Sequence, residues 1–209
     1  MPDSDPIRVL CVDDHPLVRN GVRLALHQER DIQVVAEAAN GLEAVEAFRE
    51  FRPTVTLMDL KMPLMDGFEA TAAIRREFPN ALIVILTRLS GDIKASRAFR
   101  LGAVGYLLKG HPLRDLIDTI RGVQLGQRRI PFEIASDIAA HLDSAELSSR
   151  EIEVLQQVAS GCGNKIVANN LYISEDTVKG HMKSVLAKLR ANDRTHAVTI
   201  ALRRGFLDA

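Results

Sequence analysis

The sequence predicts an α/β domain with a five-stranded, parallel, doubly wound sheet, followed by a smaller all-α domain. Two patterns predict this fold class. The first 125 residues alternate short apolar runs with amphipathic stretches, whereas the chain from Ser148 onward is amphipathic with no strand signal. Strand–helix units in series imply parallel strands with helices on both faces, because each crossover must carry the chain back across the sheet.

Five short apolar runs are the predicted strands. They are Ile7–Val12, Ile32–Ala38, Val55–Met58, Leu82–Leu86 and Gly105–Leu108. Each run is followed by a stretch whose apolar residues recur at helical spacing. These predicted helices are Pro16–Glu29, Leu42–Arg49, Phe68–Phe78, Ile93–Leu101 and Leu113–Leu125. Ligands of such sheets gather beyond the carboxyl ends of the strands, so the residues after each strand are the candidates for a site.

The segment 126–147 interrupts this alternation. It opens with a polar stretch that ends in Pro131, a residue that suits the start of a helix. Ile134, Ile138 and Leu142 follow at four-residue spacing, which predicts a short linker helix. We therefore expect a first domain at 1–126, a linker at 127–146 and a second domain at 147–209.

Helix-start signals recur through the second domain. Ser148 and Glu151 form a capping box that predicts its first helix. Further starts are predicted near Asn164, at Ser174 and at Asp193, and Gly205 is a suitable terminator for the last helix.

Composition and charge exclude several classes of protein. No apolar run is long enough to span a membrane and no signal-peptide pattern is present, so we expect a cytoplasmic protein. Cys11 and Cys162 fall in different predicted domains and form no zinc-binding or disulfide pattern. The net charge is zero, but residues 131–146 carry four acidic side chains and no basic one, whereas residues 147–209 carry nine basic and six acidic ones. This distribution places any nucleic-acid contact in the second domain.

Ionisable residues follow three of the predicted strands. Asp13 and Asp14 follow the first strand, Asp59 the third and Lys109 the fifth, while Thr87 follows the fourth. All five residues are expected at one edge of the sheet. Three clustered carboxylates need a counter-charge, and Mg²⁺ is a hard cation that binds few carboxylates while keeping its waters. A carboxylate neutralised in this way can attack a phosphoryl group, whose charge the ion and the lysine would balance.

Each of these residues also has an ordinary alternative role. An aspartate after a strand is commonly a turn former or a helix cap, and Lys109 alone would be a solvated side chain. A flavin-nucleotide binder needs Ser, Thr or Gly after the first strand, where Asp13 and Asp14 would repel the phosphate. A phosphatase with an aspartate nucleophile usually has a second aspartate two residues later, and this chain has Lys61 there. The ordered set of five residues favours a phosphoacceptor pocket over these alternatives.

Three segments resemble the receiver domain of two-component response regulators, which has a flavodoxin-like fold. They are VDDHP at 12–16, LMDLKMPxMDG at 57–67 and GYLLK at 105–109, and the likeness spans residues 6–126. The resemblance implies that Asp59 accepts a phosphoryl group from a histidine kinase and that Thr87 and Lys109 bind this group. Tyr106 takes the position of an aromatic residue whose rotamer is coupled to Thr87 in the family.

The same resemblance implies a set of Mg²⁺ contacts. These come from Asp14, Asp59 and the backbone carbonyl of Lys61, with Asp13 acting partly through water. Two positions depart from the family pattern. Arg88 follows Thr87 where most receivers have a small residue, and Gly110 follows Lys109 where many have proline. Arg88 either hinders access to the pocket or reaches toward the phosphoryl group, and the sequence leaves both open.

The segment 174–190 carries a second signal. Its apolar residues share one helical face that should meet a core, namely Val178, Met182, Val185, Leu186 and Leu189. The other side carries Lys179, Lys183 and Arg190 with Gly180 and Ala187 between them, and no acid lies from Thr177 to Arg190. Small residues among cations let a helix approach a DNA groove, although a solvated lysine face is the common alternative. A short helix at 165–171 and a tight turn at 172–174 fit helix-turn-helix geometry.

Four segments of the second domain resemble the LuxR-type DNA-binding domain. They are LSSRExEVL at 147–155, NKxVA at 164–168, ISxxTVKxH at 173–181 and KLxAxDRTxA at 188–197. With the receiver in front, the chain is similar to the NarL/FixJ family of transcriptional regulators. The resemblance implies DNA contacts from Thr177, Lys179, Gly180, Lys183 and Arg190. Ile166 departs from the family, which commonly has glutamate there, and this change is expected to expose an apolar side chain.

The last predicted helix, Arg194–Arg204, has an apolar stripe wider than one intradomain face needs. The resemblance supports a dimer contact there, which we assign to Ala197, Val198 and Ala201. A deeper core in the second domain is the alternative explanation.

The sequence therefore predicts a phosphorylation-controlled regulator that binds DNA as a dimer and assists its own Mg²⁺-dependent phosphorylation without being an enzyme. Its expected partners are a sensor histidine kinase, an inverted-repeat promoter site and a second copy on activation, with RNA polymerase as a candidate and no membrane. Two alternatives stay open: an enzyme of aspartyl-phosphate chemistry, and a receiver whose helical domain docks a protein partner. The kinase, the promoters and the sign of regulation are not encoded in these motifs.

Overall fold

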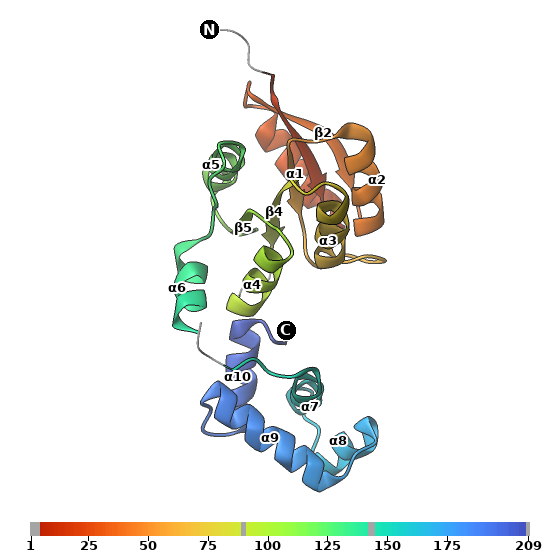
Figure 1. Ribbon diagram of the computed structural model, residues 1–209, viewed down its shortest axis with the longest axis vertical. Helices are drawn as coiled ribbons and strands as arrows, with labels where there is room; N and C mark the ends of the chain where they lie inside the picture. Colours follow the sequence, from red (N-terminus) through yellow and green to blue (C-terminus); the bar gives the residue numbers. More distant parts are fainter. Residues whose placement is uncertain (1–4, 89–90, 142–144, 208–209) are drawn as a thin grey trace. The chain divides into compact units, whose positions relative to one another are not determined.

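The computed structural model describes residues 5–88, 91–141 and 145–207. The chain folds into two compact units. The first contains a five-stranded sheet with flanking helices, and the second contains the helices α7 to α10 (Figure 1). None of the helices in the described part of the chain is both long and apolar enough to cross a bilayer.

All strands of the sheet are parallel and lie in the order β2-β1-β3-β4-β5. Their bounds are β1 Ile7–Val12, β2 Ile32–Ala38, β3 Val55–Met58, β4 Leu82–Thr87 and β5 Gly105–Leu108. The predicted strands are confirmed, except that β4 extends by one residue to include Thr87. Val12 pairs with Met58, and Thr87 pairs with Leu108, so the carboxyl ends of these strands reach the same edge.

Helices connect the strands as predicted, with different ends. They are α1 Pro16–Leu26, α2 Gly41–Phe51, α3 Gly67–Glu77, α4 Asp92–Arg100 and α5 Leu113–Gln124. The first ends before the predicted Glu29 because a turn, closed by the Glu29 N–H on the Leu26 carbonyl, leads directly into β2. The second runs on to Phe51, where Arg52 ends it in the left-handed conformation.

The sheet is covered on both faces. On one face, Val22 and Leu26 of α1 and Ile120 of α5 pack with inward residues of all five strands in one buried cluster. On the α4 side of β5, the rings of Phe99 and Tyr106 lie 6.5 Å apart. The α2 helix contacts β1 and β2. Side chains on both faces of the parallel sheet are thus covered, which is the doubly wound arrangement that the sequence predicts.

The segment after α5 extends the sheet at its β5 edge. Arg129 donates its backbone N–H to the Val104 carbonyl at 3.2 Å, and the Tyr106 N–H donates to the Arg129 carbonyl at 2.9 Å. The linker helix is then formed as α6 (Phe132–Ala140). Leu142, which was expected to continue its apolar stripe, lies outside the described residues.

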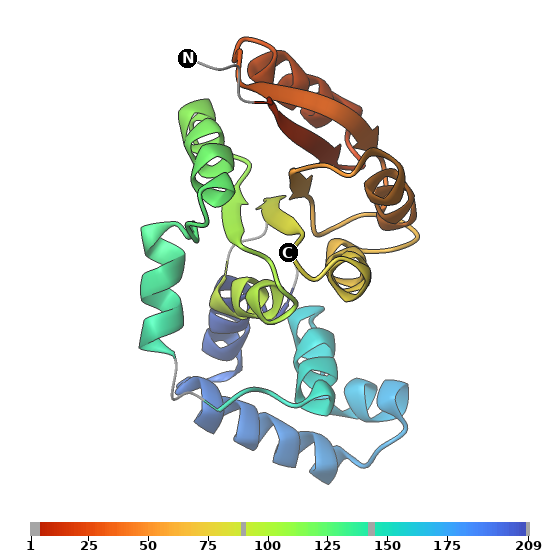
Figure 2. The same cartoon turned by 45° about the horizontal axis from the view of Figure 1, so that its top comes forward.

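The second unit is a helical bundle. Its helices are α7 Ser149–Ala159, α8 Asn164–Leu171, α9 Glu175–Leu189 and α10 Arg194–Arg204. The predicted starts at Ser148, Asn164, Ser174 and Asp193 and the end at Gly205 are confirmed. The α7, α8 and α10 helices all contact α9, the long helix at the blue end of the chain in Figure 2.

Candidate functional site

Backbone hydrogen bonds at the carboxyl ends of the strands place the predicted pocket. The Asp59 N–H donates to the Val12 carbonyl at 2.9 Å, and the Lys109 N–H donates to the Thr87 carbonyl at 2.8 Å. Each of these bonds continues a strand pairing by one residue. The functional side chains therefore stand at fixed positions on neighbouring strand ends.

Lys109 joins two of the acidic side chains. Its Nζ lies 2.6 Å from Asp59 Oδ2 and 2.6 Å from Asp13 Oδ2. The other Asp59 oxygen, Oδ1, accepts the Leu60 N–H at 2.7 Å. All three ionisable side chains are less than a tenth exposed. Asp13, Asp59 and Lys109, which are far apart in the sequence, thus form one buried cluster.

Asp14 and His15 complete a group of possible metal ligands. One ligand atom from each of Asp13, Asp14, His15 and Asp59 lies within 4.8 Å of the others. Asp14 Oδ1 is buried and accepts no well-aligned hydrogen bond, although His15 Nδ1 lies 2.6 Å away. An orphaned carboxylate oxygen beside two further carboxylates fits a hard divalent cation such as Mg²⁺. The sequence reasoning missed His15, whose position directly after Asp13 and Asp14 was the available signal.

Thr87 and Tyr106 lie inside the first unit. Thr87 is buried at the end of β4, and Tyr106 on β5 is fully buried. Burial, and then the negative charge of Asp59, raise the pKa of the Tyr106 phenol above its usual value. Tyr106 therefore stays protonated at neutral pH. The coupling of its rotamer to Thr87 remains a prediction.

Gly67 allows the loop after β3 to fold against Asp59. A Cβ atom at this position would stand 1.9 Å from the Asp59 carbonyl oxygen, so any side chain would force the backbone apart. The Gly67 N–H donates to the Leu60 carbonyl at 3.0 Å and closes the loop. The glycine of the 57–67 motif is thus a packing requirement. The Lys61 side chain is exposed, and the role of its carbonyl remains a prediction.

Arg88 contacts His15, one member of the group of possible metal ligands. Its Nη2 lies 3.3 Å from His15 Nε2, which joins the loop after β4 to the loop after β1. His15 Nδ1 faces carboxylate oxygens, 3.3 Å from Asp13 Oδ1, so Nδ1 is the donor nitrogen of the ring. The opposite nitrogen, Nε2, is then the acceptor for the Arg88 N–H.

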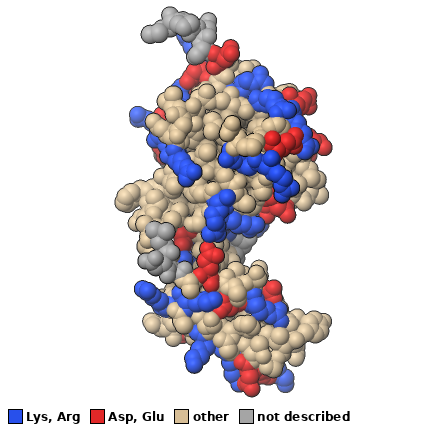
Figure 3. Space-filling model, viewed as in Figure 1, with Lys and Arg blue, Asp and Glu red and all other residues tan. Residues whose placement is uncertain are grey.

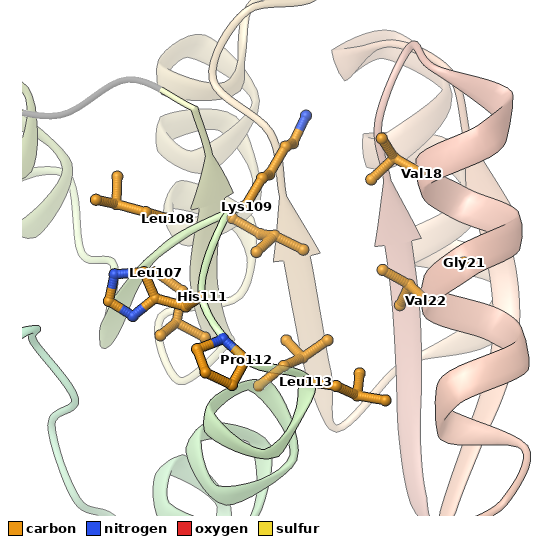
Figure 4. Close-up of a pocket in the computed structure, with 11 residues that line it drawn as sticks. Val18, Gly21, Val22, Leu107, Leu108, Lys109, His111, Pro112 and Leu113 are labelled. Carbon is orange, nitrogen blue, oxygen red and sulfur yellow. The ribbon is translucent and has the colours of Figure 1, made fainter.

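An apolar groove of about 300 Å³ lies beside the pocket, between α1 and the start of α5. Val18 and Val22 of α1 face Pro112 and Leu113 across it, and Lys109 stands at one end (Figure 4). Leu113, which lines this groove, is exposed. The receiver fold thus presents apolar surface directly next to the residue that contacts Asp59.

The α9 helix has the two faces that its sequence predicts. Val178, Met182, Val185 and Leu189 are buried in the core of the second unit, and Leu186 packs partly against it. The predicted DNA-binding residues Thr177, Lys179, Gly180, Lys183 and Arg190 are all exposed. Lys179 Nζ pairs with Asp176 Oδ1 at 2.9 Å, so this lysine has to leave a surface ion pair to meet a phosphate or a base.

Glu151 fixes the orientation of α9 from inside the bundle. This buried carboxylate accepts hydrogen bonds from Ser184 Oγ at 2.6 Å and from Lys188 Nζ at 2.7 Å, both on α9. It also accepts the Ser148 N–H at 2.7 Å in the capping box of α7. The sequence predicts the cap, but the contacts with α9 depend on tertiary packing.

The turn between α8 and α9 is held by Arg150. Its Nη2 donates to the Leu171 carbonyl at 2.6 Å, at the carboxyl end of α8. Tyr172 then ends the helix in the left-handed conformation and is 96% exposed. The predicted helix-turn-helix connection is therefore present. Ile166 on α8 is 53% exposed, as expected from its departure from the family pattern.

The dimer contact assigned to α10 is wrong for two of its three residues. Ala197 and Ala201 are fully buried in the core of the second unit, and Val198 packs partly against the same core. A buried methyl group cannot also contact a second copy. The wide apolar stripe of α10 is explained by packing against α7 and α9, which leaves Thr195, Thr199 and Leu202 as exposed residues of this helix.

Charge is mixed on the surface in view in Figure 3, where basic and acidic side chains alternate instead of forming a single basic field. The neutral net charge of the chain agrees with this pattern. Electrostatic attraction of a polyanion to such a surface depends on local cations more than on the overall charge.

Two family models match the chain. The response regulator receiver domain matches residues 9–121, and the luxR family of bacterial regulatory proteins matches residues 145–201. The transcriptional regulatory protein LiaR of Bacillus subtilis is 38% identical over 205 residues, which cover 94% of this chain and 97% of LiaR.

Solved structures are similar over nearly the whole length. The response regulator ChrA of a heme-sensing two-component system is 35% identical with a TM-score of 0.58, covering 98% of this chain and 100% of ChrA. The response regulator RcsB in complex with DNA is 26% identical with a TM-score of 0.70, covering 95% of this chain and 99% of RcsB.

Proposed function

The chain belongs to the two-component response regulators that carry a luxR-type DNA-binding domain, and from this premise we propose that Asp59 is its phosphoacceptor and that phosphorylation controls binding to DNA. The observation that carries the proposal is the contact of Lys109 with both Asp13 and Asp59 at the strand ends. Among the described residues of the acidic group, Asp59 is the only carboxylate that both follows β3 and forms a direct ion pair with Lys109.

The proposed reaction is transfer of a phosphoryl group to Asp59. A carboxylate oxygen attacks phosphorus, the bond from phosphorus to the donor breaks, and the donor leaves with the electron pair. Lys109 is placed to bind the transferred group, and the buried Thr87 hydroxyl ends the neighbouring strand. The pocket is proposed to act on the chain's own aspartate and not to turn over an external substrate.

Mg²⁺ is the proposed cofactor. Asp13, Asp14 and Asp59 would hold it, and the bound ion would supply positive charge to the phosphoryl oxygens. The chain's own contribution to Mg²⁺ binding is to hold three carboxylates close together. Among the described residues, Lys109 is the only cation with a direct ion pair to Asp59, so the carboxylates outnumber the cations around them.

A sensor histidine kinase is the proposed donor. The apolar groove between α1 and α5 ends at Lys109, whose ammonium group touches Asp59. A helix that carries a phosphohistidine would lay apolar residues in this groove and bring its phosphoryl group to the pocket. The same surface would admit a small phosphodonor without a docking partner.

The phosphoacceptor is tested by labelling. Wild-type chain, treated with acetyl phosphate and Mg²⁺, should gain one base-labile phosphate by intact mass, and Asp59→Asn should gain none. Asp118→Asn, which changes an exposed aspartate of α5, is the matched control and should be labelled like wild type. Phosphate on the Asp59→Asn chain would refute the assignment.

DNA binding as a dimer is proposed from the exposed cations of α9, since a twofold pair of such helices would read an inverted repeat. DNA that co-purifies with the phosphorylated chain identifies the site by sequencing. Retardation of that DNA, together with sedimentation of the chain with and without acetyl phosphate, then tests the switch. Equal DNA affinity and equal mass in both states would refute it.

A further inference from the structure

We propose that Arg88 is a second cationic ligand of the phosphoryl group on Asp59, positioned over the pocket by its hydrogen bond with His15. The inference rests on the proposed phosphorylation of Asp59. It answers the question that the sequence leaves open, because it assigns Arg88 a binding role and not that of an obstruction.

The geometry places the guanidinium next to the acidic group. Arg88 directly follows Thr87, whose carbonyl accepts the Lys109 N–H, so its backbone belongs to the edge of the pocket. Its side chain spans from the loop after β4 to His15 on the loop after β1, with Nη2 3.3 Å from Nε2. The His15 ring also contacts Asp13 and Asp14 through its opposite nitrogen. Two loops 73 residues apart are thus joined across the acidic cluster.

The charge balance of the pocket favours a second cation. The pocket holds three carboxylates, of Asp13, Asp14 and Asp59, and one ammonium group, of Lys109. A bound divalent cation would bring this group to neutrality. Phosphorylation then replaces one carboxylate charge by a phosphoryl group of about −1.5 to −2, which leaves an excess of negative charge. One guanidinium offsets this excess.

Arginine has the chemistry for this role. Its planar group carries five N–H donors, of which the hydrogen bond to His15 Nε2 uses one. A charge-assisted bond to a phosphoryl oxygen is stronger than a bond to a neutral nitrogen, so the arriving group should draw Arg88 from His15. The Arg88 side chain is exposed, so solvent is available to it during this rotation.

The test uses the full chain with fluoroberyllate as the phosphoryl mimic and Mg²⁺ present, and measures binding by fluorine NMR. Arg88→Gln, which keeps a polar side chain but removes the charge, should weaken fluoroberyllate affinity about tenfold, and Arg88→Lys should lie between this variant and wild type. Mg²⁺ affinity without fluoroberyllate should change less than about twofold, which separates a phosphoryl contact from general disruption of the pocket. Arg114→Gln, on the exposed side of α5, should match wild type in both measurements.

Two results would overturn the assignment. Equal fluoroberyllate affinity in wild type and Arg88→Gln would leave Arg88 no part in binding the group. Faster association and dissociation of fluoroberyllate in Arg88→Gln, with unchanged affinity, would show that Arg88 is a steric barrier. The proposed function is judged separately, by labelling of wild-type Asp59 with acetyl phosphate. A labelled wild type with an unaffected Arg88→Gln refutes only the role of Arg88, and an unlabelled wild type refutes the phosphoacceptor itself.

Discussion

Lys188 Nζ on α9 lies 2.7 Å from Glu151 Oε2 at the start of α7, inside the second unit. Burial opposes ionisation of Glu151, but hydrogen bonds from Lys188, Ser184 and Ser148 outweigh it and lower the pKa of the carboxyl to about 2. The ionised Glu151 therefore links the start of α7 to the helix proposed to enter DNA.

This relationship predicts a dependence of stability on pH. The pKa of Glu151 falls from 4.5 to about 2 on folding, so its contribution is complete above 4.5 and is lost as the pH drops toward 2. Glu151→Gln should cost about 1–3 kcal/mol of unfolding free energy at neutral pH, and less at about pH 3. Urea unfolding followed by circular dichroism measures the difference. Glu153→Gln, which removes an exposed ion pair with Arg150, should have little effect at either pH, and a cost of Glu151→Gln that does not change with pH would contradict the prediction.

The cations of α9 should contribute to DNA binding through counterion release. Removing a lysine that contacts phosphate lowers the slope of log affinity against log salt by about one unit and weakens all sequences alike. A lysine that contacts a base edge costs about 1–3 kcal/mol at its own base pair. We expect the first behaviour for Lys183→Ala and the second for Lys179→Ala, measured on the co-purified site across a salt series. Arg114→Ala in the receiver is the control and should leave the slope unchanged. If Lys179→Ala and Lys183→Ala also match wild type in affinity and slope, the exposed face of α9 does not contact DNA.

Replacing Asp14 should weaken Mg²⁺ binding. Its Oδ1 is the buried carboxylate oxygen without a well-aligned donor, so it is the oxygen best placed to gain from a cation. Asp14→Asn should lower the Mg²⁺ affinity by about tenfold, or about 1.4 kcal/mol, in a calorimetric titration. Asp118→Asn is the control, and unchanged affinity in Asp14→Asn would place the metal elsewhere.

The pairing of the linker with β5 should protect one specific backbone amide from hydrogen exchange. The Tyr106 N–H donates to the Arg129 carbonyl, and the Arg129 N–H donates to Val104. Arg129→Pro removes the second donor, so we expect faster hydrogen exchange at the Tyr106 amide with little change at Leu107. Arg128→Ala changes the preceding side chain and keeps both backbone bonds, and should exchange like wild type. Unchanged exchange at Tyr106 would show that the pairing does not persist in solution.

The buried alanines of α10 should not tolerate enlargement. Ala201 is fully enclosed, so Ala201→Leu should destabilise the second unit by about 1–3 kcal/mol through overpacking. Thr199→Leu, on the exposed side of the same helix, should change stability by less than about 0.5 kcal/mol. Thermal unfolding compares the two. If Ala201→Leu left stability unchanged, Ala201 would not be enclosed by the core, and the dimer contact predicted from the sequence would be possible at this residue.

Sequence patterns were sufficient wherever a local rule decides the structure. Apolar runs of strand length, helical spacing and the capping box of Ser148 and Glu151 determined the elements, because these signals act over a few residues. The candidate pocket was also predictable, since parallel strands must bring Asp13, Asp59 and Lys109 to the same edge. The exposed face of α9 followed from periodicity alone.

Contacts between distant segments were decided only by the tertiary structure. Periodicity shows that Ala197 and Ala201 lie on an apolar face, but not whether a neighbouring helix or a second copy covers it. The same limit applies to Arg88, for which the sequence allows two roles until its guanidinium is seen beside His15. The sequence predicts Glu151 as part of a helix cap. Its hydrogen bonds with Ser184 and Lys188 form only because α9 packs against α7. A residue type and its local spacing determine what a side chain can do, whereas its partner depends on which distant backbone the fold brings within hydrogen-bonding distance.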